Sequence, residues 1–136
     1  MSDERRKIVL AGSGYLGACI AGLASNYTYK SILEYSRTEK TSSNIEHIRK
    51  DFDEETYHLD EITESSSIIY MAPPRQDSNG DNRLQNFLSK LSDRKICKIT
   101  YISTSGVYGD HNDRVVNEAS ELNPITARAK RRVSAE

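Results

Sequence analysis

Three glycines near the N-terminus form the pattern in this sequence with the clearest chemistry. Gly12, Gly14 and Gly17 follow an apolar run and precede a segment of small residues. In such a loop the first glycine allows a tight turn, the second lets the backbone approach a pyrophosphate, and the third lets helix and strand pack closely. The amide groups at the helix start then face the anion. The pattern predicts a dinucleotide-binding loop made of Gly12, Ser13, Gly14, Tyr15, Leu16 and Gly17.

Two other interpretations share this glycine spacing, namely an ordinary strand-to-helix turn and the similar loop of a methyltransferase. The flanking residues favour dinucleotide binding. Residues 8–10 are apolar and largely β-branched, as in a buried strand, and residues 18–24 are suited to a buried helix face.

The end of the second predicted strand bears on which dinucleotide is bound. NAD-specific loops place an acidic residue about twenty residues beyond the glycines, whereas an arginine there accommodates the 2′-phosphate of NADP. Here that place holds Ser36 and Arg37, with Lys40 on the same loop. The sequence therefore favours NADP(H) over NAD(H). The alternative is that Arg37 is a solvated loop residue and that Glu34 or Glu39 marks the true strand end, which would suit NAD.

Predicted strands alternate with predicted helices along the chain. The strands cover residues 7–10, 31–36, 56–60, 67–72 and 98–103, and the helices cover 18–24, 44–51 and segments near 82–92 and 125–136. Ala72, the last residue before two prolines, joins the candidate cofactor-binding set. The alternation predicts a Rossmann-like, doubly wound α/β fold, with a parallel sheet of about five strands in three α/β/α layers. With 136 residues we expect one domain, 1–136.

Composition and charge argue against several partners. A net charge of −1 gives no electrostatic reason to expect nucleic acid or a membrane surface. The N-terminus precedes only a short apolar run, so we expect neither a signal peptide nor a membrane span. Cys19 and Cys97 lack metal-ligand spacing and are interpreted as small buried hydrophobic residues, with no metal site expected. A reducing cytoplasm fits this cysteine usage.

A second motif follows the fifth predicted strand, where Thr104 and Ser105 precede Val-Tyr-Gly at 107–109. With the glycine loop, the later Asn-Pro at 123–124 and Glu136, it resembles the extended short-chain dehydrogenase/reductase superfamily, which includes sugar-nucleotide epimerases and dehydratases. The resemblance covers essentially the whole chain.

The resemblance implies roles for individual residues. In that family a serine or threonine at this strand end hydrogen-bonds the reacting substrate oxygen, which points to Thr104, with Ser105 as the neighbouring candidate. The alternative is that these hydroxyls only cap the turn. Asp60, after the predicted strand 56–60, would accept from the adenine amine as in related proteins, although aspartate is equally common in turns.

One departure from the family concerns proton transfer. Family members place a tyrosine acid/base four residues before a lysine that lowers its pKa and holds the nicotinamide ribose. The matching positions here are Arg128 and Arg132. Arginine stays protonated up to about pH 12, so neither residue readily donates and recovers a proton near neutrality. Four residues apart on one helix face, they are candidates to hold an anionic substrate group or the cofactor ribose and phosphate; a solvated basic face is the alternative.

A second departure is length, because extended members continue far beyond this point. The resemblance implies that most of the C-terminal substrate-binding region is missing, either in a truncated member or in a module completed by another chain. The helices near 82–92 and 125–136 correspond to those through which relatives form homodimers. Two functions are expected: an NADP-binding oxidoreductase or epimerase acting on a sugar nucleotide or related carbonyl or hydroxyl substrate, and a non-catalytic dinucleotide sensor or regulatory module.

Overall fold

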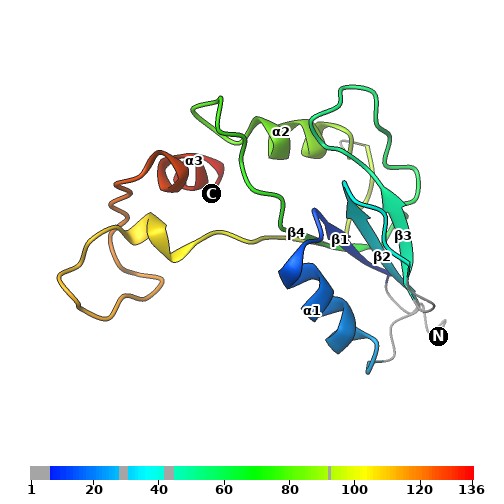
Figure 1. The fold of residues 1–136 in the computed structure, drawn as a ribbon, viewed down its shortest axis with the longest axis horizontal. Helices are drawn as coiled ribbons and strands as arrows, with labels where there is room; N and C mark the ends of the chain where they lie inside the picture. The colour runs from blue at the N-terminus through cyan, green and yellow to red at the C-terminus, as the bar shows by residue number, and fades with distance from the viewer. Residues whose placement is uncertain (1–6, 28–30, 42–44, 92) are drawn as a thin grey trace.

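A five-stranded parallel sheet organises the chain (Figure 1). The computed structural model describes residues 7–27, 31–41, 45–91 and 93–136. The elements in chain order are β1 (Lys7–Ala11), α1 (Tyr15–Ala24), β2 (Ser31–Ser36), β3 (Glu46–Arg49), β4 (Ser67–Tyr70), α2 (Asn82–Ser89), β5 (Lys98–Tyr101), the 3-10 helix η1 (Ser105–Tyr108) and α3 (Ala127–Ala135). The strand order is β3-β2-β1-β4-β5. The predicted doubly wound α/β fold is confirmed.

Helices cover the sheet from both sides. Figure 1 shows α1 on one face and α2 and α3 toward the other. On the α1 face, Ala21 and Ala24 pack against Ile8, Leu10 and Ile32 of the sheet. The small residues predicted to form a buried helix face allow α1 to lie close to β1 and β2.

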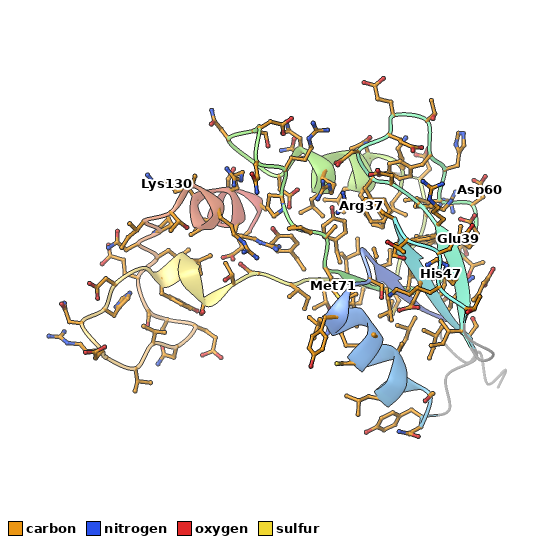
Figure 2. The ribbon with its side chains drawn as sticks, in the orientation of Figure 1. Arg37, Glu39, His47, Asp60, Met71 and Lys130 are labelled. Carbon is orange, nitrogen blue, oxygen red and sulfur yellow. The ribbon has the colours of Figure 1, made fainter. Side chains whose placement is uncertain are left out.

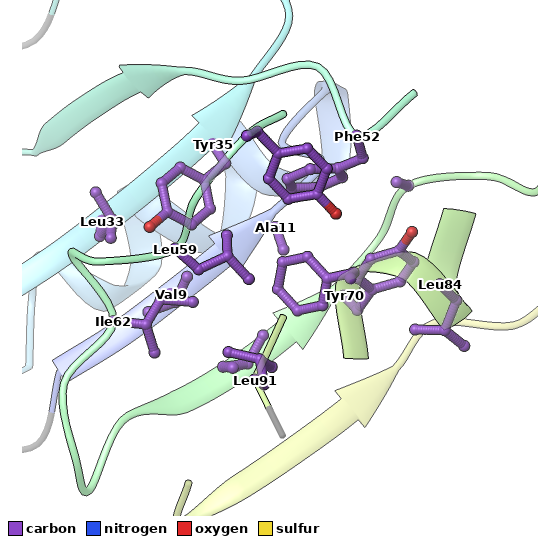
Figure 3. Packing of buried hydrophobic residues seen from close by; sticks show 14 residues of the cluster. Val9, Ala11, Leu33, Tyr35, Phe52, Leu59, Ile62, Tyr70, Leu84 and Leu91 are labelled. Carbon is purple, nitrogen blue, oxygen red and sulfur yellow. The ribbon is translucent and has the colours of Figure 1, made fainter. Parts of the chain in front are cut away.

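The larger core lies on the α2 face and is rich in aromatic rings (Figure 3). Phe52 is its centre, with its ring centroid 5.4 Å from that of Tyr57, 6.1 Å from Tyr70 and 5.1 Å from Phe87. These tilted, stacked and edge-on contacts stabilise aromatic pairs beyond their buried area. The core thereby fixes the segment that follows β3 against β4 and α2.

Capping differs among α1, α2 and α3. Asp81 caps α2 by accepting from the N–H of Leu84 at 3.0 Å, and Thr126 caps α3 by accepting from the N–H of Ala129 at 3.1 Å. Gly14, at the start of α1, offers no side-chain cap. The first amides of α1 therefore lack the side-chain partner that the other two helices have.

The helix predicted for residues 44–51 is wrong. Residues 46–49 form the edge strand β3, in which His47 pairs with Glu34 and Ile48 pairs with Tyr35 of β2; residue 44 lies outside the described residues. Ile45 and Ile48 are three apart, a spacing that favours a helix in isolation. Parallel hydrogen bonding to β2 overrides this local preference.

The strand predicted for residues 56–60 is also wrong, because this segment joins no ladder. Its alternation is real, since Tyr57 and Leu59 are buried while Thr56, His58 and Asp60 are exposed. The segment lies across the core instead of along a strand edge, since β3 already occupies the position beside β2.

The cysteine interpretation is wrong as well, because Cys19 and Cys97 are both exposed. The apolar residues of α2 and of the turn after it belong mainly to the core: Leu84, Phe87 and Leu91 are buried, whereas Leu88 is 40% exposed. Within the described residues, no helix has both the length and the apolar character needed to cross a membrane.

Candidate dinucleotide-binding site

The strand order creates a crevice between the ends of β1 and β4. The chain runs outward from β1 to β2 and β3, then returns to place β4 on the other side of β1. In open α/β sheets, ligands bind at this reversal, outside the carboxyl ends of the strands. Gly12 follows β1 there with a φ of +82°, and a Cβ on it would lie 2.6 Å from the Cβ of Ala72. Both the left-handed backbone and the close approach of the two loops require glycine.

The glycine loop is anchored on one side and open on the other. The N–H groups of Gly12 and Ser13 donate to the carbonyl of Tyr35 at 3.0 and 2.8 Å. A Cβ on Gly14 would meet no atom within 4 Å, whereas a Cβ on Gly17 would lie 2.1 Å from Ser13 Oγ. Gly17 therefore permits the helix to pack against the loop, and Gly14 leaves space into which a ligand can approach the backbone.

A cavity of about 510 Å³ opens beside this loop. Its wall comes from the loops after β1, β2, β3 and β4, together with Arg83 of α2. This volume falls within the range of small-molecule sites, roughly 300 to 1,000 Å³. The structure brings together at this cavity six of the predicted site residues: Gly12, Ser13, Gly14, Ser36, Arg37 and Ala72.

The cavity wall is strongly cationic, with four cationic side chains against the single carboxylate of Asp51. Three of the cations form ion pairs: Lys40 with Glu34 at 3.6 Å, Lys50 with Glu61 at 3.0 Å and Arg83 with Asp53 at 2.6 Å. Arg37, the fourth, is exposed and forms no ion pair with any residue that the structure describes. It is therefore the cation in this wall that can bind an anion without first losing a carboxylate partner.

The acidic residues that would suit NAD lie away from the cavity wall. Glu34 is 4% exposed and its carboxylate accepts from Ser13 Oγ beneath the glycine loop. Glu39 is exposed and does not line the cavity. Ser36 ends β2 with its hydroxyl donating to the carbonyl of Thr38 at 2.6 Å. The end of β2 thus offers no carboxylate to repel a 2′-phosphate.

Arg83 joins two walls of the cavity. Its Nε and Nη2 donate to the two carboxylate oxygens of Asp53 at 2.7 and 2.6 Å, and its Nη1 donates to the carbonyl of Pro73. The hydrogen bond from Arg83 holds the pKa of Asp53 below its usual value, although partial burial opposes the shift. The loops after β3 and β4 are therefore fixed relative to α2.

This pair predicts a pH-dependent stability. The folded-state pKa of Asp53 is lowered, so the ionised carboxylate stabilises the folded protein. This contribution to the free energy of unfolding is complete above the unfolded-state pKa, which is near 4. It is lost as the pH falls through the folded-state pKa. We expect Asp53→Asn to lower the free energy of unfolding by about 1 kcal/mol at neutral pH. Urea unfolding of both proteins between neutral and strongly acidic pH measures the difference, which should shrink toward zero in acid.

Asp60→Asn is the matched control, because Asp60 is in an ion pair whose carboxylate is 82% exposed. This variant should change the free energy of unfolding little. A difference that persists undiminished in acid would contradict the assignment.

Four predicted cofactor-binding residues lie outside the cavity wall, and one of them is Gly17, which is buried against Ser13. Tyr15 and Leu16 project from the first turn of α1, 89% and 44% exposed, and do not line the cavity. Asp60 pairs with Arg94 at 3.2 Å, outside the cavity wall; in Figure 2 it lies near the outer edge of the molecule. The strand that was expected to direct Asp60 toward the site is absent, and Asp51, which follows β3, lines the cavity instead.

Sequence reasoning missed several cavity residues, among them Arg83 of α2 and the run Lys50, Asp51 and Phe52. The erroneous helix over residues 44–51 concealed this run, because residues that follow a strand at its carboxyl end are the ones that reach this crevice. A strand assignment for residues 46–49 would have identified them. Phe52 also gives the cavity a rigid aromatic wall, since its ring is locked in the core.

The hydroxyl motif after β5 lies apart from this cavity. Thr104 caps η1, with its Oγ1 accepting from the N–H of Gly106 at 3.4 Å, and Ser105 is exposed at the first position of η1. Neither residue lines the cavity. The hydrogen bond of Thr104 is the kind expected if this hydroxyl caps the turn after β5.

The two predicted site arginines of α3, Arg128 and Arg132, are in different environments. Arg132 is 4% exposed, its Nη1 donates to the carbonyl of Ile102 at 2.6 Å, and its guanidinium lies 5.3 Å from the centre of the Tyr101 ring. Arg128 is exposed. Arg132 therefore holds α3 against the end of β5, while Arg128 is the one free to meet a ligand.

Comparisons with known proteins agree with this architecture. Neither a protein-family model nor a curated protein matches the sequence. Among solved structures, a UDP-galactose 4-epimerase superposes with a TM-score of 0.77 at 14% identity, over 96% of this chain and 49% of that chain. The UDP-glucuronic acid 4-epimerase from Bacillus cereus in complex with NAD has a TM-score of 0.74 at 20% identity, over 94% and 49%. The chain has a Rossmann-like fold.

A third structure is more similar in sequence. A functionally unknown conserved protein from Silicibacter pomeroyi has a TM-score of 0.74 at 26% identity, over 96% of this chain and 47% of that chain. The structural neighbours include members of the NAD-dependent epimerase/dehydratase family. This Rossmann-like chain spans about half the length of the solved structures that it matches.

Proposed function

We propose that this chain binds NADP(H) in the cavity at the carboxyl ends of β1, β2, β3 and β4, as a member of the extended dehydrogenase/reductase group. The observation that carries the proposal is Arg37, an arginine without an ion-pair partner among the described residues, which lines the same cavity as the glycine loop. A glycine loop and an arginine with an available charge in one cavity suit a ligand that has a pyrophosphate and a 2′-phosphate.

The residues present fit such a ligand. Gly14 opens into unfilled space and the first turn of α1 has no side-chain cap, so that turn can receive the pyrophosphate. Ser36 and Arg37 would lie at the adenosine ribose, where arginine binds phosphate through its fork of donors. Structural neighbours solved with NAD support a nicotinamide dinucleotide at this fold.

The named neighbours also suggest a substrate class. They include a UDP-galactose 4-epimerase and a UDP-glucuronic acid 4-epimerase, so a sugar nucleotide or a related carbonyl or hydroxyl compound is proposed here. A bound nicotinamide would supply or accept a hydride at the reacting carbon. The chain's own contribution would be the hydroxyls of Thr104 or Ser105 on the reacting oxygen, and Arg128 on an anionic group of the substrate.

A second candidate is a non-catalytic dinucleotide sensor or regulatory module. The observation that favours it is the state of Arg132, whose guanidinium is buried and already bound to the carbonyl of Ile102. At the positions where relatives use tyrosine and lysine, this chain has Arg128, which does not release a proton near neutrality, and an arginine committed to packing.

Titration of the purified chain with NADPH and NADH tests the proposal. We expect saturable binding of both, with NADPH tighter by roughly ten- to a hundredfold, the value of a charge-assisted phosphate contact. Nicotinamide absorbance in the presence of carbonyl compounds and nucleotide sugars then separates the two candidates. Binding without turnover supports the sensor, and steady enzyme-dependent turnover supports the enzyme. Absence of binding for both nucleotides would refute the proposal.

A further inference from the structure

A buried carboxylate lies directly beneath the proposed pyrophosphate-binding loop. Glu34 is in β2, 4% exposed, and its carboxylate accepts a hydrogen bond from Ser13 Oγ. Ser13 is itself 5% exposed, and its hydroxyl lies between Glu34 and the position that a Cβ of Gly17 would occupy. A negative charge at this depth is costly, and it would repel an anion bound by the same loop.

Lys40 is the cation that lies over this carboxylate. Its Nζ is 3.6 Å from Glu34 Oε1 and donates to the carbonyl oxygen and to the hydroxyl of Ser13, each at 3.2 Å. An ammonium has three donors. Two of these donors are bound to Ser13 and the ammonium is paired with Glu34, so the side chain of Lys40 is held on the glycine loop and its charge lies next to the carboxylate.

His47 holds the backbone of Lys40 in place. Its Nδ1 accepts from the N–H of Lys40 at 3.4 Å, which leaves the proton of a neutral imidazole on Nε2, 2.8 Å from Ser36 Oγ. The Ser36 hydroxyl donates in turn to the carbonyl of Thr38. Figure 2 shows His47 in the sheet region and Lys130 far away on α3. Lys40 is thus fixed at its backbone by β3 and at its side chain by β2 and the glycine loop.

We propose that Lys40 screens Glu34, so that the glycine loop presents no net negative charge to a bound pyrophosphate. The proposal rests on the proposed function and assigns Lys40 a role different from that of Arg37. Arg37 distinguishes NADP(H) from NAD(H), whereas the Lys40–Glu34 pair acts on the pyrophosphate that both nucleotides share. Its loss therefore affects both nucleotides, and removal of the carboxylate compensates for removal of the lysine.

Four variants test the proposal by calorimetric titration with NADPH and with NADH. Lys40→Met leaves the buried carboxylate unscreened and should weaken the binding of both nucleotides by about tenfold or more. Adding Glu34→Gln to Lys40→Met should return both affinities to within about threefold of the wild type, as expected for directly coupled groups. Glu34→Gln alone should bind both nucleotides at least as tightly as the wild type. Lys130→Met, an exposed lysine on α3, is the matched control and should have no effect.

The other possible outcomes of these titrations distinguish the proposal from its alternatives. Loss of NADPH affinity alone in Lys40→Met would overturn the proposal and make Lys40 a ligand of the 2′-phosphate. The proposal is also overturned if the double variant binds both nucleotides as weakly as Lys40→Met. That result would mean that Lys40 binds the ligand directly, since removing a carboxylate cannot restore a lost direct contact. If Lys40→Met does not fold, weakened binding by Glu34→Gln alone overturns the proposal and wild-type binding supports it. A wild-type chain that binds neither nucleotide refutes the proposed function itself, and the screening role with it.

Discussion

Gly14→Val should abolish binding of both NADPH and NADH while the chain stays folded. A Cβ on Gly14 meets no protein atom within 4 Å, so the larger side chain fits without displacing the core. It fills the space through which the uncapped first turn of α1 would receive a pyrophosphate. Calorimetric titration measures the affinity, and thermal unfolding shows that the fold is retained.

Gly22→Val provides the matched control for this experiment. Gly22 lies later in α1, and a Cβ there also meets nothing within 4 Å. The two variants make the same chemical change, one at the N-cap of α1 and one within it, but Gly22 is outside the cavity wall. We expect Gly22→Val to bind like the wild type. Wild-type affinity for both nucleotides in Gly14→Val would show that the loop is not a pyrophosphate site.

Arg37→Ala should weaken NADPH binding by roughly ten- to a hundredfold and leave NADH binding nearly unchanged. Arg37 lines the cavity and has no ion-pair partner among the described residues, so its full charge is available to a 2′-phosphate. Removing it loses a charge-assisted contact that only NADPH makes. The measurement is the ratio of the two dissociation constants, by titration of the wild type and the variant.

Arg114→Ala controls for the general loss of positive charge, since Arg114 is exposed and outside the cavity wall. It should leave the NADPH-to-NADH ratio unchanged. Equal losses for both nucleotides in Arg37→Ala would instead indicate that Arg37 acts on a group common to both, and would remove the argument for NADP.

Local sequence patterns predicted most of the elements that build the crevice. The bounds of β2, Ser31–Ser36, agree with the prediction, and β1, β4 and β5 lie where apolar runs placed them, with ends shifted by one or two residues. β1, β2 and β4 contain buried apolar residues, whereas β5 is only partly buried. All four strands are bounded by glycine, proline or polar turns, so their signal lies within a few neighbouring residues. The glycine loop was equally visible, because its function depends on residues lacking a Cβ at fixed spacing.

The edge strand β3 and the segment after it could not be predicted in the same way. β3 has only four residues, none of them fully buried, and its pairing partner is more than ten residues away in the chain. Strand formation there depends on the free edge of β2, which is a property of the assembled sheet. The misplaced strand at 56–60 moved the expected adenine contact to Asp60, whereas Asp51 lines the cavity.

The sequence by itself determined the fold class, the glycine loop and the presence of Arg37 at the end of β2, because each depends on residue type and local spacing. Only the tertiary structure decided which charges are available. Glu34, Asp53 and Glu61 pair with cations of other segments, and Arg132 is buried against β5. An ion pair depends on a separation of a few ångströms between two side chains, and these separations exist only after the sheet and its loops have assembled.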